Sequence, residues 1–257
     1  MEMPAGWIVP EWPAPSNVRA ICTTRLGGLS EPPYDTLNLG DHVGDAPEAV
    51  ATNRKILGDV LGARPVFLTQ VHGSGVVNLQ ADTMEATRAD GCITIARDLA
   101  CTIMVADCLP VLFATADGST VAAAHCGWRG LAGQAGRGII ESLWERLQRG
   151  HGARAEHTIA WLGPCIGPQA FEVGPEVKAA FEAHDPKAGP LFKPHGSGKW
   201  LADLPGLARL RLQALGLSQL YGNDGTIGWC TVANASRFFS HRRDRVSGRF
   251  AAAVWRV

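Results

Sequence analysis

Short blocks of apolar residues, separated by polar turns rich in glycine and proline, recur along the whole chain. Runs of small, β-branched and aromatic residues are typical of strands, whereas apolar residues three and four positions apart are typical of one helix face. The first pattern predicts strands at residues 18–24, 65–73, 76–79, 92–96, 99–106, 111–114, 121–124, 157–162, 227–232 and 249–255. The second predicts helices at residues 45–61, 139–147, 174–183 and 203–215, and residues 188–197 are expected to form a loop.

The most informative stretch is residues 120–130, TVAAAHCGWRG. It begins as a buried strand, continues into a glycine-flanked turn, and is followed by the helical pattern of residues 139–147. The end of such a strand lies beside unpaired helix N–H groups, where anions bind readily. His125 and Arg129 occupy this position, so the stretch is a candidate functional site.

Two other chemically competent side chains stand at the ends of apolar runs. Strict alternation in residues 65–73 predicts that Val66, Leu68, Gln70 and His72 share one strand face. Cys108 lies between the apolar runs 99–106 and 111–114. A histidine or cysteine in such a place is often only a buried structural residue.

If these strands are neighbours, His72, Cys108 and His125 converge on one rim. Two imidazoles and a thiolate bind zinc well, and three protein ligands leave a fourth position open, as in catalytic zinc sites. The same residues also fit a nucleophilic site, in which Cys108 is the thiolate and His72 or His125 is its base. The spacing of 36 and 17 residues does not decide between these interpretations.

Composition narrows the class of protein. Hydrophobic residues make up 46% and charged residues 19% of the 257 residues, which is typical of a soluble globular protein. The 24 basic and 24 acidic residues balance, which argues against a nucleic-acid binder. No apolar run approaches membrane-spanning length, and the first residues lack the basic and apolar regions of a secretory signal. The seven scattered cysteines favour reduced thiols in a cytoplasm, and no composition break divides residues 1–257, so one domain is expected.

Several familiar motifs are absent from the sequence. There is no G-x-x-x-x-G-K-[ST] P-loop, no G-x-S-x-G nucleophile elbow and no paired C-x-x-C zinc ribbon. The H-x-E and P-C-x-x-C pair of zinc nucleobase deaminases is also missing. No His-x-His pair occurs, which argues against a multi-copper oxidase centre, and Met104 is the only methionine near enough in sequence to suggest a blue-copper site.

A series of motifs spread over nearly the whole chain resembles the laccase-domain family, also called the purine nucleoside phosphorylase or peptidoglycan editing factor family. The motifs occur in this order: Thr23-Thr24-Arg25 with Gly27-Gly28, Leu37-Asn38-Leu39-Gly40, Gln70-Val71-His72-Gly73, Ala106-Asp107-Cys108-Leu109-Pro110, Ala124-His125-Cys126-Gly127-Trp128-Arg129-Gly130, Leu162-Gly163-Pro164-Cys165-Ile166-Gly167-Pro168, Phe171-Glu172-Val173-Gly174, Lys199-Trp200, Asp203-Leu204 and Arg242-Arg243-Asp244. Two positions depart from the family pattern: Cys126 stands where alanine is usual, and His241 where tyrosine is common.

The resemblance implies an α+β fold, a single-domain α-β-β-α layered sandwich with mixed sheets, similar to a toxin-type deamidase domain. It also implies a zinc ion held by His72, Cys108 and His125, with copper as the less favoured metal. Activities attributed to such proteins are phosphorolysis of adenosine, inosine, guanosine and methylthioadenosine, and deamination of adenosine. Some relatives resemble amide hydrolases that remove serine from a UDP-muramyl-serine precursor during peptidoglycan editing.

The leading hypothesis is therefore a zinc-dependent purine nucleoside phosphorylase with adenosine deaminase activity, acting on a nucleoside and phosphate as a monomer or small homo-oligomer. Arg25 and Arg129 are expected to hold phosphate, because guanidinium groups match phosphate oxygens. Asn38 is assigned to substrate binding, and Asp107 joins Cys108 and His72 as a catalytic candidate. The first rival is the amide hydrolase, and a rival of another class is a non-catalytic metal- or nucleoside-binding regulator.

Overall fold

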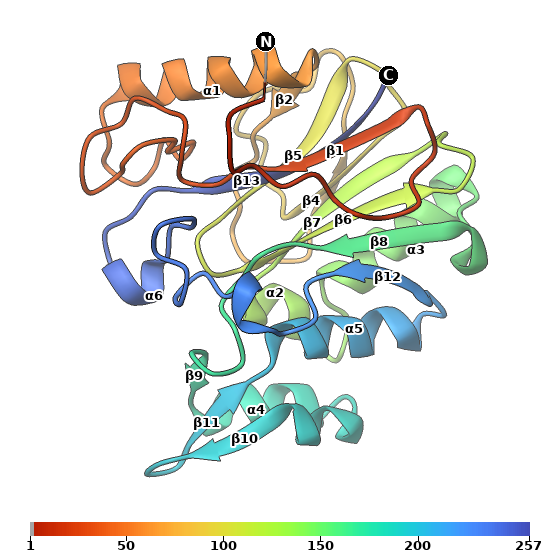
Figure 1. Cartoon of the computed structure of the whole chain (residues 1–257). Coiled ribbons are helices and arrows are strands. Elements are labelled where there is room, and N and C mark those ends of the chain that lie inside the picture. Colours follow the sequence, from red (N-terminus) through yellow and green to blue (C-terminus); the bar gives the residue numbers. More distant parts are fainter. Residues whose placement is uncertain (1–2) are drawn as a thin grey trace.

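Two β-sheets form the centre of the molecule (Figure 1). The computed structural model describes residues 3–257. The first sheet has the order β1-β13-β5-β2, formed by Val18–Cys22, Phe250–Arg256, Leu99–Val105 and Arg64–Val66. The second has the order β12-β8-β6-β7-β4-β3, formed by Gln219–Gly222, Thr158–Leu162, Leu109–Thr115, Val121–Cys126, Gly91–Thr94 and Val76–Asn78. Both sheets combine parallel and antiparallel neighbours.

Helices cover the outer faces of the two sheets, and a third, smaller sheet extends from one end (Figure 1). The helices are α1 (Pro47–Leu61), α2 (Trp128–Ala132), α3 (Ile139–His151), α4 (Pro175–Glu182), α5 (Leu204–Ala214) and α6 (His241–Asp244). Three 3-10 turns span Ala155–His157, Pro186–Leu191 and Ile227–Trp229. The small sheet has the order β10-β11-β9, formed by Phe192–His195, Lys199–Ala202 and Glu172–Val173.

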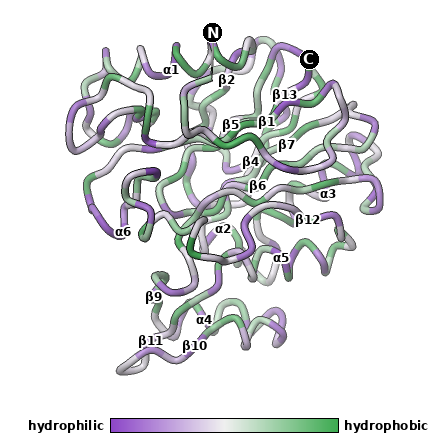
Figure 2. Tube along the Cα trace, in the orientation of Figure 1, coloured by the Kyte–Doolittle hydropathy of each residue, from purple (hydrophilic) through white to green (hydrophobic). Residues whose placement is uncertain are grey.

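The buried residues form one layer between the sheets and one layer under the helices on each side. Alternation along β5 sends Cys101 and Ile103 into the space between the sheets, and Ala100 and Met104 toward α1. In the second sheet, residues of β7 alternate between the same inter-sheet layer and the layer under α3 and α5. Figure 2 shows the matching pattern, with hydrophobic segments in the central strands and hydrophilic ones at outer turns. The expected α+β class with mixed sheets and α-β-β-α layers is confirmed.

Most predicted strands and helices are present, and four local expectations are wrong. The strand predicted at residues 65–73 ends at Val66, and the rest is a loop in which His72 has a φ of 58°. The first helix begins at Pro47, with Ala46 as its N-cap, rather than at residue 45, and it ends at Leu61 before Gly62, which has a φ of 60°. Residues 227–232 begin with a 3-10 turn instead of a strand, and residues 188–197 contain β10 rather than only loop.

Candidate metal centre

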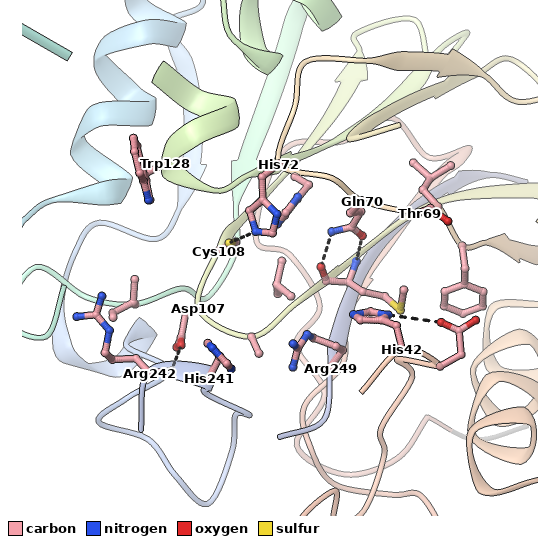
Figure 3. Close-up of a pocket in the computed structure, with 18 of the residues that line it drawn as sticks. His42, Thr69, Gln70, His72, Asp107, Cys108, Trp128, His241, Arg242 and Arg249 are labelled. Carbon is pink, nitrogen blue, oxygen red and sulfur yellow. Dashed lines mark hydrogen bonds and ion pairs between the residues drawn. The ribbon is translucent and has the colours of Figure 1, made fainter. Parts of the chain in front are cut away.

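His72, Cys108 and His125 meet at one end of the layer between the two sheets. On the antiparallel pair β6–β7, Pro110 faces His125, so Cys108, just before β6, lies beside the end of β7. Residues 121 and 123 of β7 point into the inter-sheet layer, and His125 shares their parity, so its ring continues that side of the strand. The loop after β2 brings His72 to the same point (Figure 3). The ligand atoms of the three residues all lie within 4.8 Å of one another.

The loop that carries His72 is fixed by two polar side chains that replace strand pairing. The carboxamide of Gln70 donates to the Met104 carbonyl and accepts from the Met104 amide, each at 2.8 Å (Figure 3). The buried carboxylate of Asp90, just before β4, accepts the amides of His72 at 2.9 Å and Gly73 at 2.8 Å, and that of Val71 at 3.2 Å. These bonds satisfy the backbone of a loop that would otherwise lack partners.

Asp90 also orients the second imidazole. Nδ1 of His125 donates to Oδ1 of Asp90 at 2.8 Å, and the two side chains are buried, with exposures of 3% and 0%. Because a carboxylate only accepts, Nδ1 carries the proton and Nε2 is left for a metal or for Cys108. The motif search missed Asp90, and its only signal was the Ala-Asp-Gly turn before a short strand.

The electrostatics of the cluster favour a thiolate. Burial acts to raise the pKa of Cys108, but the charges and hydrogen bonds of His125 and His72 outweigh it and lower the pKa to about 6. Burial acts to lower the pKa of His125, whereas Cys108 and Asp90 raise it to about 9. Burial likewise opposes ionisation of Asp90, but its hydrogen bonds with His125 and the Gly73 and Val71 amides hold its pKa below the usual value. Without a metal, the site therefore resembles a thiolate–imidazolium pair.

The shape of the site fits a zinc-sized ion. Tetrahedral zinc with sulfur and nitrogen ligands places its donor atoms about 3.3–3.6 Å apart, and Cys108 Sγ lies 3.7 Å from His72 Nε2. Gly127 lies against this pair, because a Cβ there would lie 2.7 Å from His72 Cδ2 and 3.0 Å from Cys108 Sγ. The missing side chain at this position leaves the imidazole and the sulfur free to approach one ion.

Selective alkylation of Cys108 provides a direct test of this centre. In metal-free protein, iodoacetamide is expected to modify Cys108 first, with a rate that rises through a pH near 6, because the thiolate is the reacting form. The other six cysteines are buried. Peptide mass mapping measures the site, and added zinc should protect it. Equal modification with and without zinc would contradict metal binding by Cys108.

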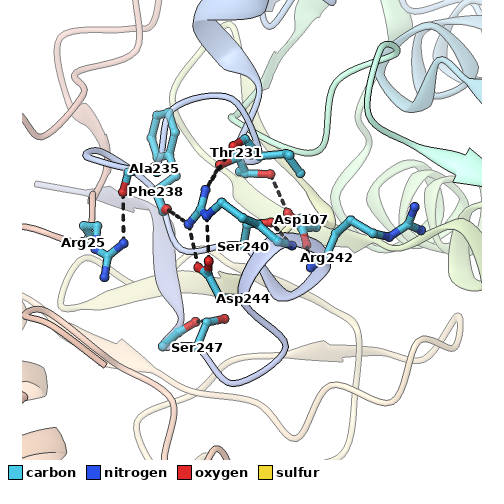
Figure 4. Close-up of polar contacts among 12 residues, drawn as sticks. Arg25, Asp107, Thr231, Ala235, Phe238, Ser240, Arg242, Asp244 and Ser247 are labelled. Atoms are coloured by element: carbon cyan, nitrogen blue, oxygen red, sulfur yellow. Dashed lines mark hydrogen bonds and ion pairs between the residues drawn. The ribbon is translucent and has the colours of Figure 1, made fainter. Parts of the chain in front are cut away.

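The centre opens into a pocket of about 570 Å³. Its walls are formed by residues from both sheets and from the C-terminal segment: Asp41, His42, Arg54, Phe67, Leu68, Thr69, Gln70, His72, Glu85, Ala86, Met104, Val105, Ala106, Asp107, Cys108, His125, Trp128, Ile166, Phe171, Leu204, His241, Arg242 and Arg249. Asp107 Oδ1 accepts the Thr231 hydroxyl and Oδ2 accepts the Arg242 amide, both at 2.6 Å (Figure 4). Both carboxylate oxygens are thus engaged in holding the pocket wall to the segment that contains α6.

Three predicted substrate-binding residues lie outside these walls. The Arg25 guanidinium is paired with Asp35 Oδ1 at 3.0 Å and donates to the Ala235 carbonyl (Figure 4). Asn38 is fully buried, and Arg129 stacks on the Trp128 ring with 4.4 Å between its guanidinium carbon and the ring centroid. Their contact with substrate stays a prediction, whereas the arginines that do line the pocket are Arg54, Arg242 and Arg249.

Sequence patterns marked some of these wall residues and not others. Arg242 belongs to the Arg242-Arg243-Asp244 motif, and His241 is the departure noted just before it, so the family resemblance had marked both. Arg249 had no such signal, because it looked like the first residue of a strand. The departure at His241 lies on the pocket wall, while that at Cys126 is buried under α3.

No helix in residues 3–257 is both long and apolar enough to cross a membrane.

The chain matches one protein family over most of its length, and it is similar to two bacterial proteins that share one name. The family described as multi-copper polyphenol oxidoreductase laccase matches residues 19–257. The Pseudomonas aeruginosa protein named purine nucleoside phosphorylase PA4543 is 47% identical over 251 residues, covering 97% of this chain and 98% of that protein. The Escherichia coli protein named purine nucleoside phosphorylase YfiH is 46% identical over 252 residues, with the same coverage.

Solved structures agree with these sequence relatives. The Neisseria meningitidis protein NMB0706 superposes with a TM-score of 0.89 at 43% identity, over 98% of this chain and 99% of that one. YlmD from Geobacillus stearothermophilus has a TM-score of 0.89 at 30% identity, over 100% and 98% of the two chains.

Proposed function

This chain belongs to the family described as multi-copper polyphenol oxidoreductase laccase, and from that membership and the site we propose that it is a zinc-dependent purine nucleoside phosphorylase. The proposed substrates are adenosine, inosine, guanosine and methylthioadenosine, with deamination of adenosine as a second activity. The observation that carries the proposal is the cluster of two imidazoles and one thiol at the base of a 570 Å³ pocket. Relatives named purine nucleoside phosphorylase, 46–47% identical over nearly the full chain, support the same assignment.

His72, Cys108 and His125 would hold the zinc ion. Zinc is favoured over copper because two imidazoles and one thiolate, with a fourth position open, match the ligand set of catalytic zinc sites. Bound zinc would supply a Lewis acid that polarises a substrate oxygen or nitrogen. Asp90 would keep His125 in the tautomer that offers Nε2, and Gly127 would leave room for the ion.

The remaining walls would bind and orient the nucleoside. Trp128, Phe171 and Phe67 supply aromatic surface of the kind that packs against a purine, and the concave site would exclude water from the reacting atoms. Asp107 is fixed at the wall by Thr231 and the Arg242 amide, so it would act first as a positioning and electrostatic group. Its use as a proton donor to the leaving purine stays a prediction.

The test is a product assay on the zinc-loaded protein. Inosine incubated with inorganic phosphate should give hypoxanthine and ribose 1-phosphate, and omission of phosphate should stop the release of hypoxanthine. Adenosine should give inosine in a parallel reaction. Release of serine from a muramyl-serine nucleotide without purine release would favour the amide hydrolase, and tight nucleoside binding without any product would favour a regulator; either result would overturn the proposal.

A further inference from the structure

We propose that Arg249 is the anchor of an oxyanion site that binds a phosphate group in the pocket. Arg249 lies immediately before β13, on the wall of the pocket that holds the His72–Cys108–His125 centre (Figure 3). Arg249 is half-buried, and its backbone and stem are held by contacts with Asn38 and Gly40. The inference deepens the proposed phosphorylase function and, where the anion is free phosphate, rests on it.

The backbone of Arg249 is fixed by a buried asparagine. Asn38 Oδ1 accepts the Arg249 amide at 2.8 Å and the Gly40 amide at 2.9 Å, and the Arg249 carbonyl accepts the Leu39 amide at 2.9 Å. Asn38 is 0% exposed and is not among the residues that line the pocket. The motif Leu-Asn-Leu-Gly at residues 37–40 would therefore position Arg249, with Asn38 as the positioning residue.

The stem of the arginine passes over a glycine that has no room for a side chain. A Cβ on Gly40 would lie 2.8 Å from Arg249 Cγ and 3.2 Å from its Cβ. At the far end, Nη1 donates to the Ser247 carbonyl at 2.9 Å and the Gly248 carbonyl at 3.0 Å. One edge of the guanidinium is thereby anchored by protein carbonyls. Within residues 3–257, Nε and Nη2 have no protein acceptor, so the other edge remains available.

The charge of this guanidinium is not neutralised by a carboxylate in contact with it. In the described part of the chain, Arg54 is paired with Asp41 at 3.2 Å, but neither Arg249 nor Arg242 has a carboxylate within ion-pair distance. Asp107 and Cys108 are near enough to act on the charge of Arg249. Asp107 is already committed to Thr231 and the Arg242 amide, and Cys108 belongs to the metal centre.

A guanidinium with one free edge matches an oxyanion, because two parallel N–H donors fit two oxygens of a phosphate. The anion bound there would lie in the same pocket as the metal centre, where phosphorolysis requires an attacking phosphate. Free inorganic phosphate and the phosphate of a nucleotide share this chemistry. The favoured source is free phosphate, because the proposed reaction consumes it.

Equilibrium dialysis with radiolabelled inorganic phosphate tests the site on the zinc-loaded full-length protein. Arg249→Gln should raise the dissociation constant for phosphate about 10- to 100-fold, since it removes a charge-assisted bidentate contact. Arg249→Lys should recover only part of the affinity, because the ammonium keeps the charge without the planar fork. Gly40→Ala should also weaken phosphate binding, although it leaves every charge in place. Arg97→Gln, at an exposed arginine outside the pocket, should have no effect.

Further measurements distinguish free phosphate from the phosphate of a nucleotide, and they test the phosphate site separately from the proposed phosphorylase function. If free phosphate does not bind, but adenosine 5′-monophosphate binds and its binding falls in Arg249→Gln, the anion recognised at this site is the phosphate of a nucleotide. Equal phosphate binding by wild type and Arg249→Gln, loss confined to Arg242→Gln, or no binding of either phosphate probe would overturn the inference. If the wild type phosphorolyses inosine and Arg249→Gln leaves the KM for phosphate unchanged, the inference fails while the proposed function stands. If phosphate binding depends on Arg249 but the wild type does not phosphorolyse inosine, the inference stands and the proposed function fails.

Discussion

Replacing His125 with alanine is expected to abolish both stoichiometric zinc binding and phosphorolysis of inosine. Within the described residues, His125 would supply one of three candidate ligand atoms, so its removal leaves only His72 and Cys108 to hold the ion. A catalytic zinc site with two protein ligands binds its metal far more weakly than one with three. Metal analysis of the purified variant and a hypoxanthine assay measure the two losses together.

His157→Ala is the matched control, because this exposed histidine lies in the 3-10 turn before β8, away from the pocket. It should retain full zinc and activity. Circular dichroism and thermal melting check that His125→Ala still folds. Turnover by His125→Ala at the wild-type rate, with no metal bound, would end the metal-dependent proposal.

Replacing Asp90 with alanine is expected to have the largest effect on stability. The change leaves the amides of Val71, His72 and Gly73 and the Nδ1–H of His125 without their acceptor. Removing one partner of a buried charged network costs about 3–5 kcal/mol, and loss of the group that orients a metal ligand lowers metal affinity about 10- to 100-fold. Denaturant unfolding of the metal-free protein and zinc titration measure these effects separately.

The contribution of Asp90 to stability should depend on pH. Its pKa in the folded protein is lowered, so its stabilising effect is present above the unfolded-state pKa of about 3.9 and is lost as the pH falls through the folded value. The difference in unfolding free energy between wild type and Asp90→Ala should therefore shrink in acid, as Asp90 is protonated. It should also shrink as the pH rises from about 6.5 through about 9, because Asp90 contributes to the raised pKa of His125 and this contribution is lost when His125 deprotonates. Asp98→Ala, at an exposed position before β5, is the control and should change stability little. A difference that stays unchanged down to strongly acidic pH would contradict the role assigned to the Asp90 carboxylate.

Local patterns predicted most strands of this fold well because burial dominates them, whereas the layered architecture was implied by the family resemblance. Residues 99–106 and 121–124 are apolar on both faces, as strands covered on each side must be. Residues 67–73 misled the prediction for a specific reason. Their alternation resembles a strand, but their backbone amides at residues 71–73 bond the side chain of Asp90, and the side chain of Gln70 bonds the backbone of Met104. Those partners are distant in sequence, so no local pattern reveals them.

In the candidate site too, some residues could be predicted from local sequence and others depended on tertiary contacts. The three metal-binding candidates stood out as histidine or cysteine at the ends of apolar runs, and the structure brings them together. The anion-binding residues were assigned by residue type alone, and Arg25 proved to be occupied by Asp35. Whether an arginine is paired inside the protein or open to a ligand depends on tertiary contacts, so the distinction between Arg25 and Arg249 required the structure.

The three ligand positions belong to different parts of the sandwich. His72 follows β2 of the first sheet, Cys108 lies on the connection from β5 to β6, and His125 is part of β7 in the second sheet. An ion held by all three would cross-link the two sheets, and the complete ligand set would exist only after both sheets have assembled. Metal loading would then follow folding rather than guide it, and the loaded protein would resist separation of its two halves longer than the empty one.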